Sequence, residues 1–323
     1  MASKIRDVHT GAHRAVFPEI TAGELPKLPV LPVNRTLVHR ANLHDVLPTE
    51  LTRHDDTHFT VSTRWPRDHR LFVTPDGRYT ASLVLETIRQ ATLLVSHAEL
   101  GVPLGHHFVM WELCHRLDAE LLTCDATAEG ITLDVDVTEL RRRGAVPAGV
   151  AMEMTIRMGG RTVGSGSIRF NITSPAAYER IRGALRTSDD PAFAAALPEP
   201  VDPPTVHHVQ ECDVVLADTD TPGRWQLRAD PANRLFFDRI NDHIPAMVLV
   251  EAAQQAANLL VPWSRFAPSS SEMNFSRYVE FDAPCWIEAH PFTAEDGTTS
   301  VSVTGHQDGQ LAFVIRFVRS AAR

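Results

Sequence analysis

The sequence lacks several features that mark common classes of protein. It has only four cysteines (Cys114, Cys124, Cys212 and Cys285), with no Cys-x-x-Cys pair and no zinc-like pairing with histidine. No stretch of 18 or more apolar residues occurs, and the N-terminus has no apolar run typical of a signal peptide. We therefore expect free thiols, no metal site and a cytoplasmic location. Metal boxes, Gly-rich phosphate loops and Gly-x-Ser-x-Gly elbows are also missing, so no cofactor is expected.

The sequence also has fewer positive than negative residues, with 31 Lys and Arg against 40 Asp and Glu and a net charge of −9. This balance argues against a general binder of nucleic acid or of anionic membranes, whose affinity comes from basic surface. An anionic ligand would need a local cluster of Arg or His.

What the chain does contain is an internal repeat. Its 323 residues, 43% of them hydrophobic, are enough for two folded cores. The segment 83–98 is echoed by 248–261 at an offset of 165, with four identities in the ten columns that start at Glu86 and Glu251. Val38-His39 and Val206-His207 precede the two segments, and two Ile-Arg-Phe triplets close the halves. The chain therefore reads as a duplicated domain.

The repeat predicts domain boundaries. We expect a leader over 1–32, a first domain over 33–175, a linker over 176–205 and a second domain over 206–323. The linker ends in the proline-rich stretch 197–204 and has room for one helix near 176–185.

Each half predicts one long apolar helix and several strands. Period-two alternation indicates strands at 58–65, 131–137, 150–158 and 162–172, and again at 224–229, 285–289, 299–305 and 311–318. Gly159-Gly160 and Asp308-Gly309 suit tight hairpin turns. The expected fold class is α+β, with an antiparallel sheet wrapped around a helix in each half.

The two helices carry a polar stripe. In the helix at 246–260, Glu251, Gln254, Gln255 and Asn258 lie on one side of an otherwise apolar cylinder. The first helix places Glu86, Arg89 and Gln90 in the same way. The stripe is either the solvated side of a surface helix or part of a buried site. In a buried site we expect a raised carboxyl pKa, suited to general acid or base work, with Gln90 and Gln255 as orienting groups.

Larger motifs resemble a known family. The segment 245–256 is similar to the central helix of hotdog-fold dehydratases, in which the corresponding Glu is catalytic. More closely, the whole chain from about 33 to 317 resembles the A-factor synthase family of γ-butyrolactone biosynthesis. The matching motifs are Val38-His39-Arg40, Pro66-Arg67-Asp68-His69, Glu86-Thr87-Ile88-Arg89-Gln90-Ala91, Asn241-Asp242-His243-Ile244-Pro245, Glu251-Ala252-Ala253-Gln254-Gln255-Ala256 and Arg277-Tyr278-Val279-Glu280-Phe281-Asp282.

The resemblance implies two tandem hotdog domains and an acyltransferase. Such an enzyme joins a β-ketoacyl group from acyl carrier protein to a hydroxyl of dihydroxyacetone phosphate. The ester then closes to a phosphorylated butenolide, a precursor of a lactone or furan signal that controls secondary metabolism. A homodimer is compatible with this family.

Two positions depart from the related patterns. Phe237 stands where the dehydratases have a catalytic His, which disfavours dehydration, and Gln254 stands where the synthase family usually has Arg.

Acyl transfer requires a base, oxyanion donors and charge for the phosphate. As base we name Glu251 first and Glu86 second, with His243 and His69 as rivals. Backbone N–H groups at 246–249 are expected oxyanion donors. Substrate-binding candidates are Arg89, Arg234, Arg239, Arg277, Asn241, Asp242 and Gln254. The basic run 141–143 is either a solvated hairpin turn or a docking point for an acidic carrier protein.

Two alternatives stay open at this point. The first is a hotdog thioesterase or dehydratase acting on acyl carrier protein thioesters. The second is a non-catalytic protein that binds an acyl chain or lactone as a regulator.

Overall fold

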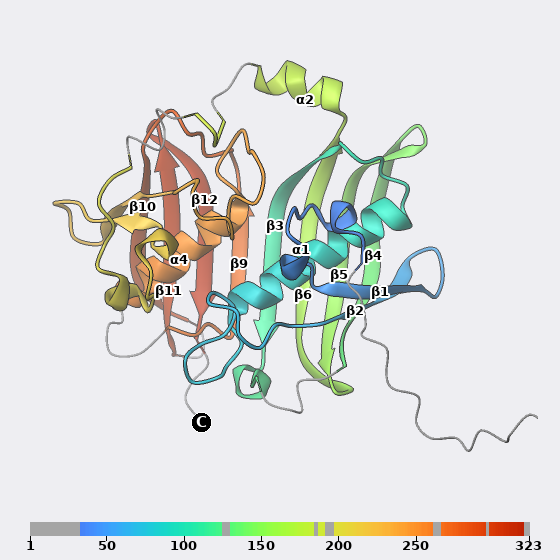
Figure 1. The fold of residues 1–323 in the computed structure, drawn as a ribbon, viewed down its shortest axis with the longest axis horizontal. Coiled ribbons are helices and arrows are strands. Elements are labelled where there is room, and N and C mark those ends of the chain that lie inside the picture. The colour runs from blue at the N-terminus through green and yellow to red at the C-terminus, as the bar shows by residue number, and fades with distance from the viewer. Residues whose placement is uncertain are drawn as a thin grey trace, which may run out of the picture. The chain divides into compact units, whose positions relative to one another are not determined.

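Two copies of one order of elements follow each other along the chain (Figure 1). The computed structural model describes residues 33–124, 130–183, 187–190, 197–260, 266–294 and 297–319, which belong to one compact unit, Pro32–Arg323. The first copy comprises β1 (Pro48–Arg53), β2 (His58–Thr63), α1 (Ala81–Ala98), β3 (His107–Leu117), β4 (Ile131–Arg143), β5 (Val146–Met158) and β6 (Arg161–Thr173). The second comprises β7 (Leu216–Ala217), β8 (Arg224–Leu227), α4 (Ala246–Leu260), β9 (Ser270–Phe275), β10 (Cys285–Thr293), β11 (Thr299–Gln307) and β12 (Gln310–Val318).

Short helices complete the pattern. The 3-10 turns η1 (Arg35–Val38) and η2 (Leu43–Asp45) precede β1, and η4 (Pro203–Val206) and η5 (Glu211–Asp213) precede β7 in the same order. A further turn, η3 (Ala119–Leu121), follows β3. Between the copies lies α2 (Pro175–Arg182), which agrees with the predicted helix near 176–185 as far as the described residues reach. The predicted leader over 1–32 lies outside the described residues, and the domain boundaries remain predictions.

The strands of the described residues form one antiparallel sheet of twelve. Their order is β1-β2-β4-β5-β6-β3-β9-β12-β11-β10-β8-β7, so each half contributes six strands in mirrored order. The halves join where β3 pairs with β9, with His115 opposite Ser271 and Leu113 opposite Met273. This continuous sheet places α1 and α4 on the same face (Figure 1).

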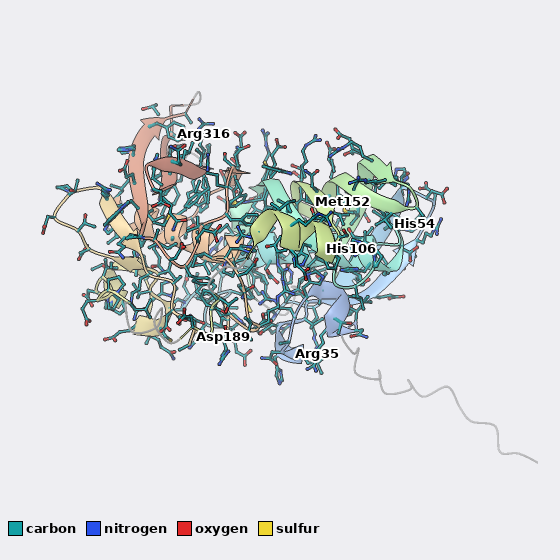
Figure 2. The ribbon with its side chains drawn as sticks, turned by 90° about the horizontal axis from the view of Figure 1, so that it is seen from above. Arg35, His54, His106, Met152, Asp189 and Arg316 are labelled. Carbon is teal, nitrogen blue, oxygen red and sulfur yellow. The ribbon has the colours of Figure 1, made fainter. Side chains whose placement is uncertain are left out.

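Both long helices are buried against this sheet. Thr80 caps α1 because its hydroxyl accepts the N–H of Leu83. The helix packs closely on β6 at Gly166, where an added Cβ would lie 2.3 Å from the Cδ1 atom of Ile88. Helix α4 packs on β10 and β11. Among the exposed side chains, His54 lies on the first half and Arg316 on the second (Figure 2).

All eight predicted strands are confirmed, with ends that differ by up to six residues. Strands β3 and β9, which join the halves, were not predicted, and neither were β1 and β7. None of the described helices is long and apolar enough to cross a membrane.

Candidate active site

A pocket lies between the N-terminal ends of α1 and α4 and is lined by both halves. Two of its pairs occupy equivalent positions in the repeat, namely Ser82 with Met247 and Glu86 with Glu251. The full lining comprises Arg40, Asp45, His69, Leu71, Phe72, Ser82, Glu86, Leu235, Phe236, Met247 and Glu251. The first two base candidates therefore face the same space, although they are far apart in sequence.

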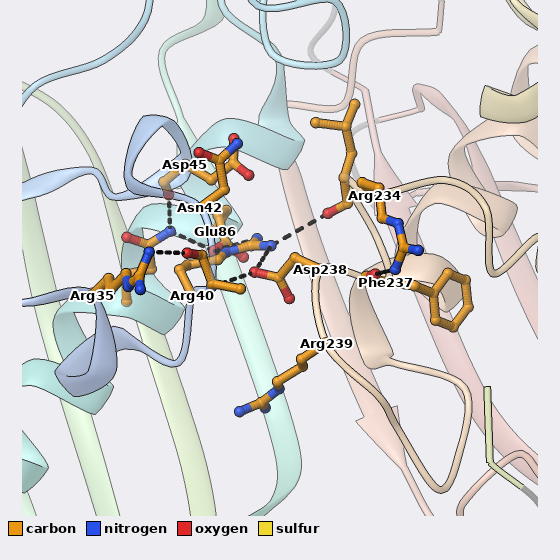
Figure 3. Close-up of polar contacts among 12 residues, drawn as sticks. Arg35, Arg40, Asn42, Asp45, Glu86, Arg234, Phe237, Asp238 and Arg239 are labelled. Carbon is orange, nitrogen blue, oxygen red and sulfur yellow. Dashed lines mark hydrogen bonds and ion pairs between the residues drawn. The ribbon is translucent and has the colours of Figure 1, made fainter. Parts of the chain in front are cut away.

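Both oxygens of the Glu86 carboxylate accept hydrogen bonds from neighbouring side chains (Figure 3). The Arg40 side chain donates Nε to Oε1 at 3.0 Å, and Arg89 donates Nε to Oε2 at 2.8 Å and Nη2 to Oε1 at 2.7 Å. Gln90 is the third residue that holds this carboxylate, and its Nε2 donates to Oε1 at 2.6 Å. Burial alone would raise the pKa of Glu86, but the two guanidinium groups lower it to about 2. The expectation of a raised pKa is thus wrong for Glu86, because two fixed cations outweigh the loss of solvation.

Arg40 also ties this carboxylate to the second half. Its Nη1 donates to the backbone oxygen of Leu235 at 3.3 Å and lies 3.6 Å from Asp238 (Figure 3). The neighbouring N–H of Ala41 donates to Asp238 at 3.0 Å. The cluster around Glu86 therefore joins the start of α1 to the loop before α4.

Glu251 has a different environment. His208 lies with its Nε2 atom 2.8 Å from Glu251 Oε1, and Gln255 donates to the same oxygen at 2.9 Å. Glu251 and His208 are only 6% and 8% exposed. The reading of the stripe as the solvated side of a surface helix is therefore wrong, since its carboxylate, Gln255 and Asn258 are all buried.

The two glutamines orient the carboxylates and also brace the fold. Gln90 accepts the N–H of Leu47 and donates to the backbone oxygen of Asp45. Gln255 makes the equivalent bonds with Val215 and Asp213. Each glutamine thus connects the central helix to the short segment that precedes its edge strand.

His69 lies in the pocket as a neutral imidazole. Burial and the nearby Arg40 lower its pKa to about 4. Because the N–H of Leu71 donates to His69 Nδ1 at 3.2 Å, the neutral ring carries its proton on Nε2, which lies 3.9 Å from Asp45. His69 stacks on Phe72. In this state its Nε2–H is a hydrogen-bond donor rather than a base.

Cationic groups gather beside the clamped carboxylate. Packing around the Arg239 guanidinium and the neighbouring Arg89 lower the pKa of Arg239, although that residue stays exposed overall. Burial, Arg239 and Arg89 lower the pKa of His39 to about 3. His39 Nε2 lies 2.9 Å from His97 Nε2. His39 is therefore neutral, and the two guanidinium groups carry the charge of the cluster Arg89–Arg239–His39, which we call the cationic recess for its place beside Glu86.

His243 and Asp242 belong to another cluster. Asp242 Oδ1 lies 2.8 Å from His243 Nδ1, and the carboxylate also accepts the Tyr178 hydroxyl at 2.9 Å and the Nε of Arg182 at 3.3 Å. Arg182 binds Glu280 with two further bonds. These contacts dock α2 on the second half, and His243 is not among the described residues that line the pocket.

The remaining candidates lie away from the pocket lining. Gln254 donates to the backbone oxygen of Phe266 at 2.6 Å, and Arg234 donates to that of Phe237 at 3.4 Å. Asn241 donates to the Arg239 oxygen at 2.8 Å, and Arg277 lies exposed after β9. These contacts give Gln254, Arg234 and Asn241 structural roles.

The expected oxyanion donors are partly occupied. The N–H groups of Val248 and Leu249 both donate to the Pro245 oxygen. This leaves the first two positions of α4, Ala246 and Met247, as the donors that open the helix, and Met247 lines the pocket.

The basic run 141–143 lies exposed at the end of β4, where the Arg142 side chain reaches the backbone oxygen of Leu100. Leu100 follows the C-terminal end of α1, whereas the pocket lies at its N-terminal end. This position favours the interpretation as a solvated turn.

Sequence reasoning missed His208 and gave no role to Arg40. The signal that could have found them is the repeated Val-His pair, because Arg40 and His208 follow it directly in the two halves. Their contacts with Glu86 and Glu251 span 46 and 43 residues, so no local pattern reveals them.

Two helices on one face of a fused antiparallel sheet, with a shared pocket at their N-terminal ends, define a tandem hotdog protein. The chain belongs to the family described as A-factor biosynthesis hotdog domain, whose model matches residues 23–174 and 190–317. The fold class is thereby confirmed.

Curated relatives share most of the chain. A "2-oxo-3-(phosphooxy)propyl 3-oxoalkanoate synthase" from Streptomyces virginiae is 42% identical over 87% of this chain and 95% of its own length. A protein of the same name from Streptomyces coelicolor is 37% identical over 88% of this chain and 90% of its own length. Among solved structures, a 12:0-ACP thioesterase from Umbellularia californica aligns with 83% of this chain and 98% of its own, at 14% identity and a TM-score of 0.48.

Proposed function

We propose that this protein transfers a 3-oxoalkanoyl group from a thioester to a hydroxyl of dihydroxyacetone phosphate. The product is a 2-oxo-3-(phosphooxy)propyl 3-oxoalkanoate. The observation that carries the proposal is the identity of 37–42%, over nearly the whole chain, with synthases named for that product. The pocket lined by both halves, which contains Glu86, Glu251 and His69, supports the proposal.

Glu251 is the proposed general base. It takes the proton of the acceptor hydroxyl while the hydroxyl oxygen attacks the thioester carbon. The C–S bond then breaks, the new C–O ester bond remains, and Glu251 returns the proton to the leaving thiolate. Glu86 is unsuited to this role, because a carboxylate with a pKa of about 2 and two arginine partners is a weak base.

Oxyanion stabilisation is assigned to donors around the same space. His69 presents its Nε2–H, and the first turns of α1 and α4 present backbone N–H groups at Ser82 and Met247. Both helix N-termini carry partial positive charge, which favours the negative charge of the tetrahedral intermediate.

The cationic recess is the proposed phosphate site. Burial and the nearby Arg89 lower the pKa of Arg239, and burial together with both arginines lowers that of His39, an arrangement that an added anion would relieve. Guanidinium groups bind phosphate oxygens through paired N–H donors. The recess borders the Glu86 cluster, so a phosphate there places the rest of a three-carbon acceptor beside the pocket.

We further propose that residues 33–175 and 206–323 act as the two halves of one catalytic unit and that acyl carrier protein is the acyl donor. The test is incubation of the purified chain with 3-oxoacyl thioesters of carrier protein or of a small thiol, with and without dihydroxyacetone phosphate. We expect thiol release that depends on the acceptor, and a phosphorylated ester or its cyclised product by mass spectrometry. Release that is the same without acceptor indicates a thioesterase, and no release from folded protein at any chain length contradicts the proposal.

A further inference from the structure

The repeat gives each helix carboxylate an equivalent partner from the preceding turn. His39 and His207 end η1 and η4 with the same left-handed backbone, at φ 54° and 60°. This unusual conformation fixes the register between the halves, so that Arg40 and His208 are equivalent residues. Arg40 binds Glu86 and His208 binds Glu251.

The geometry of the two contacts is nearly the same. The Arg40 Nη2 atom lies 2.7 Å from Glu86 Oε1, and the His208 Nε2 atom lies 2.8 Å from Glu251 Oε1. Gln90 and Gln255 donate to the same Oε1 atoms. At this position the halves therefore differ in the chemistry of the partner: a guanidinium is a permanent cation, whereas an imidazole can also act as a neutral N–H donor.

We propose that His208 is a positioning residue that makes Glu251 the reactive carboxylate of the pair, by holding Oε1 through a partner that can give up its charge. The inference rests on the proposed function. With Arg40 in its place, a carboxylate is held permanently ionised and weakly basic, as Glu86 is. A neutral His208 still donates its Nε2–H to Oε1 and adds no fixed charge, so Glu251 stays basic enough to accept the acceptor proton. Glu251 then returns that proton to the leaving thiolate, and His208 keeps its own Nε2–H throughout.

Several other charged side chains among the described residues lie near His208 and Glu251. Asp213 on η5 faces both His208 and Glu251, and Arg70 of the first half binds Asp213 at 3.2 Å. The pocket side contributes Arg40, Asp45, His69 and Glu86. Arg70 and Asp213 form one ion pair and Arg40 and Glu86 another, while His208 and Gln255 hold Oε1 of Glu251.

The test compares three variants by the pH dependence of kcat. His208→Arg should move the acidic limb to lower pH and lower the plateau by at least ~10-fold, because the carboxylate becomes a weaker base. His208→Gln keeps a neutral donor near the Nε2 position and should retain more activity than His208→Arg. The acidic limb of its kcat profile should show a single ionisation. His290→Arg, which makes the same change at an exposed site on β10, should leave rate and profile unchanged.

A second readout needs no substrate and separates this inference from the proposed function. In protein labelled with ¹³C at the imidazole, the resonance missing from His208→Gln identifies His208. Its pKa should fall in Glu251→Gln, because the carboxylate that favours the imidazolium is gone. An unchanged titration, or a His208→Arg profile that coincides with the parent profile, overturns the inference even if the enzyme proves active. A shifted titration in a protein without transferase activity upholds the coupling and refutes only the assigned reaction.

Discussion

Replacing Glu86 by glutamine tests whether the first-half carboxylate stabilises the fold rather than performing the chemistry. The change removes the charge that Arg40 and Arg89 share while keeping nearly the same shape. Arg40 is 9% exposed and Glu86 is 1% exposed in their side chains, so the variant leaves a buried guanidinium without its main counter-charge. We expect Glu86→Gln to lower the free energy of unfolding substantially.

Two routes give a similar size for this loss. The pKa of Glu86 is lowered from 4.5 to about 2, and a shift of roughly 2.5 units corresponds to about 3 kcal/mol. Breaking a buried ion pair by removing one partner typically costs about 3–5 kcal/mol. Because the folded-state pKa is depressed, this stabilisation is fully present above pH 4.5 and is lost as the pH falls towards 2.

The assay is urea unfolding of both proteins across this pH range. The two curves should be separated by about 3 kcal/mol at pH 7 and should converge below pH 4.5. Glu139→Gln is a matched control, because Glu139 also binds an arginine through two bonds but on the exposed surface, where an ion pair contributes little. A loss at pH 7 no larger than that of this control, or a separation that does not depend on pH, would refute the reasoning.

Three further outcomes follow from the site. Glu251→Gln should lower acceptor-dependent thiol release at least ~100-fold while leaving circular dichroism unchanged, and near-normal turnover would remove Glu251 as the base. Arg239→Ala should raise the KM for dihydroxyacetone phosphate at least ~10-fold, as a lost phosphate contact would. The control Arg316→Ala, on the exposed face of β12, should leave this KM unchanged. Equal KM values for the two variants would contradict the assignment of Arg239 to the phosphate. Burial raises the pKa of Cys285 to about 12, so iodoacetamide at pH 8 should label it only after unfolding, as peptide mass spectrometry would show, and rapid labelling of folded protein would contradict its burial.

Much of the fold follows from local pattern. The helices are predictable because an apolar cylinder interrupted by one polar stripe repeats at a constant offset. Strands β4 to β6 and β10 to β12 alternate with period two, because one face packs on a helix and the other meets solvent.

The strands that join the halves do not show this pattern. Strand β3 has a register shift between Met110 and Glu112 that breaks its alternation. Strand β9 begins with serines and buries Ser271, whose hydroxyl lies 2.5 Å from His115 Nδ1 across the seam. Polar groups are stable there because the other half supplies the hydrogen-bond partner, and that partner is 156 residues away.

In the candidate site, too, some features follow from local sequence pattern and others depend on distant residues. Glu86 and Glu251 could be predicted, because a buried carboxylate repeated on two apolar helices is unusual. Their different states could not, because they depend on Arg40 and His208, which come from turns before each edge strand. Neither residue type indicates chemistry until the fold brings it within 3 Å of its carboxylate.

Fusion of two hotdog units in one chain permits this asymmetry. In a symmetric dimer of identical units, any residue that improves one cleft appears in both, so a fixed guanidinium and a titratable imidazole cannot occupy equivalent positions. Here Arg40 and Arg89 stand against His208 and Gln254. A substrate that carries both a phosphate and a hydroxyl requires permanent positive charge at one end and proton exchange at the other. The proposed phosphate site draws on both halves, through Arg89 and Arg239, whereas the imidazole beside Glu251 comes from the second half alone.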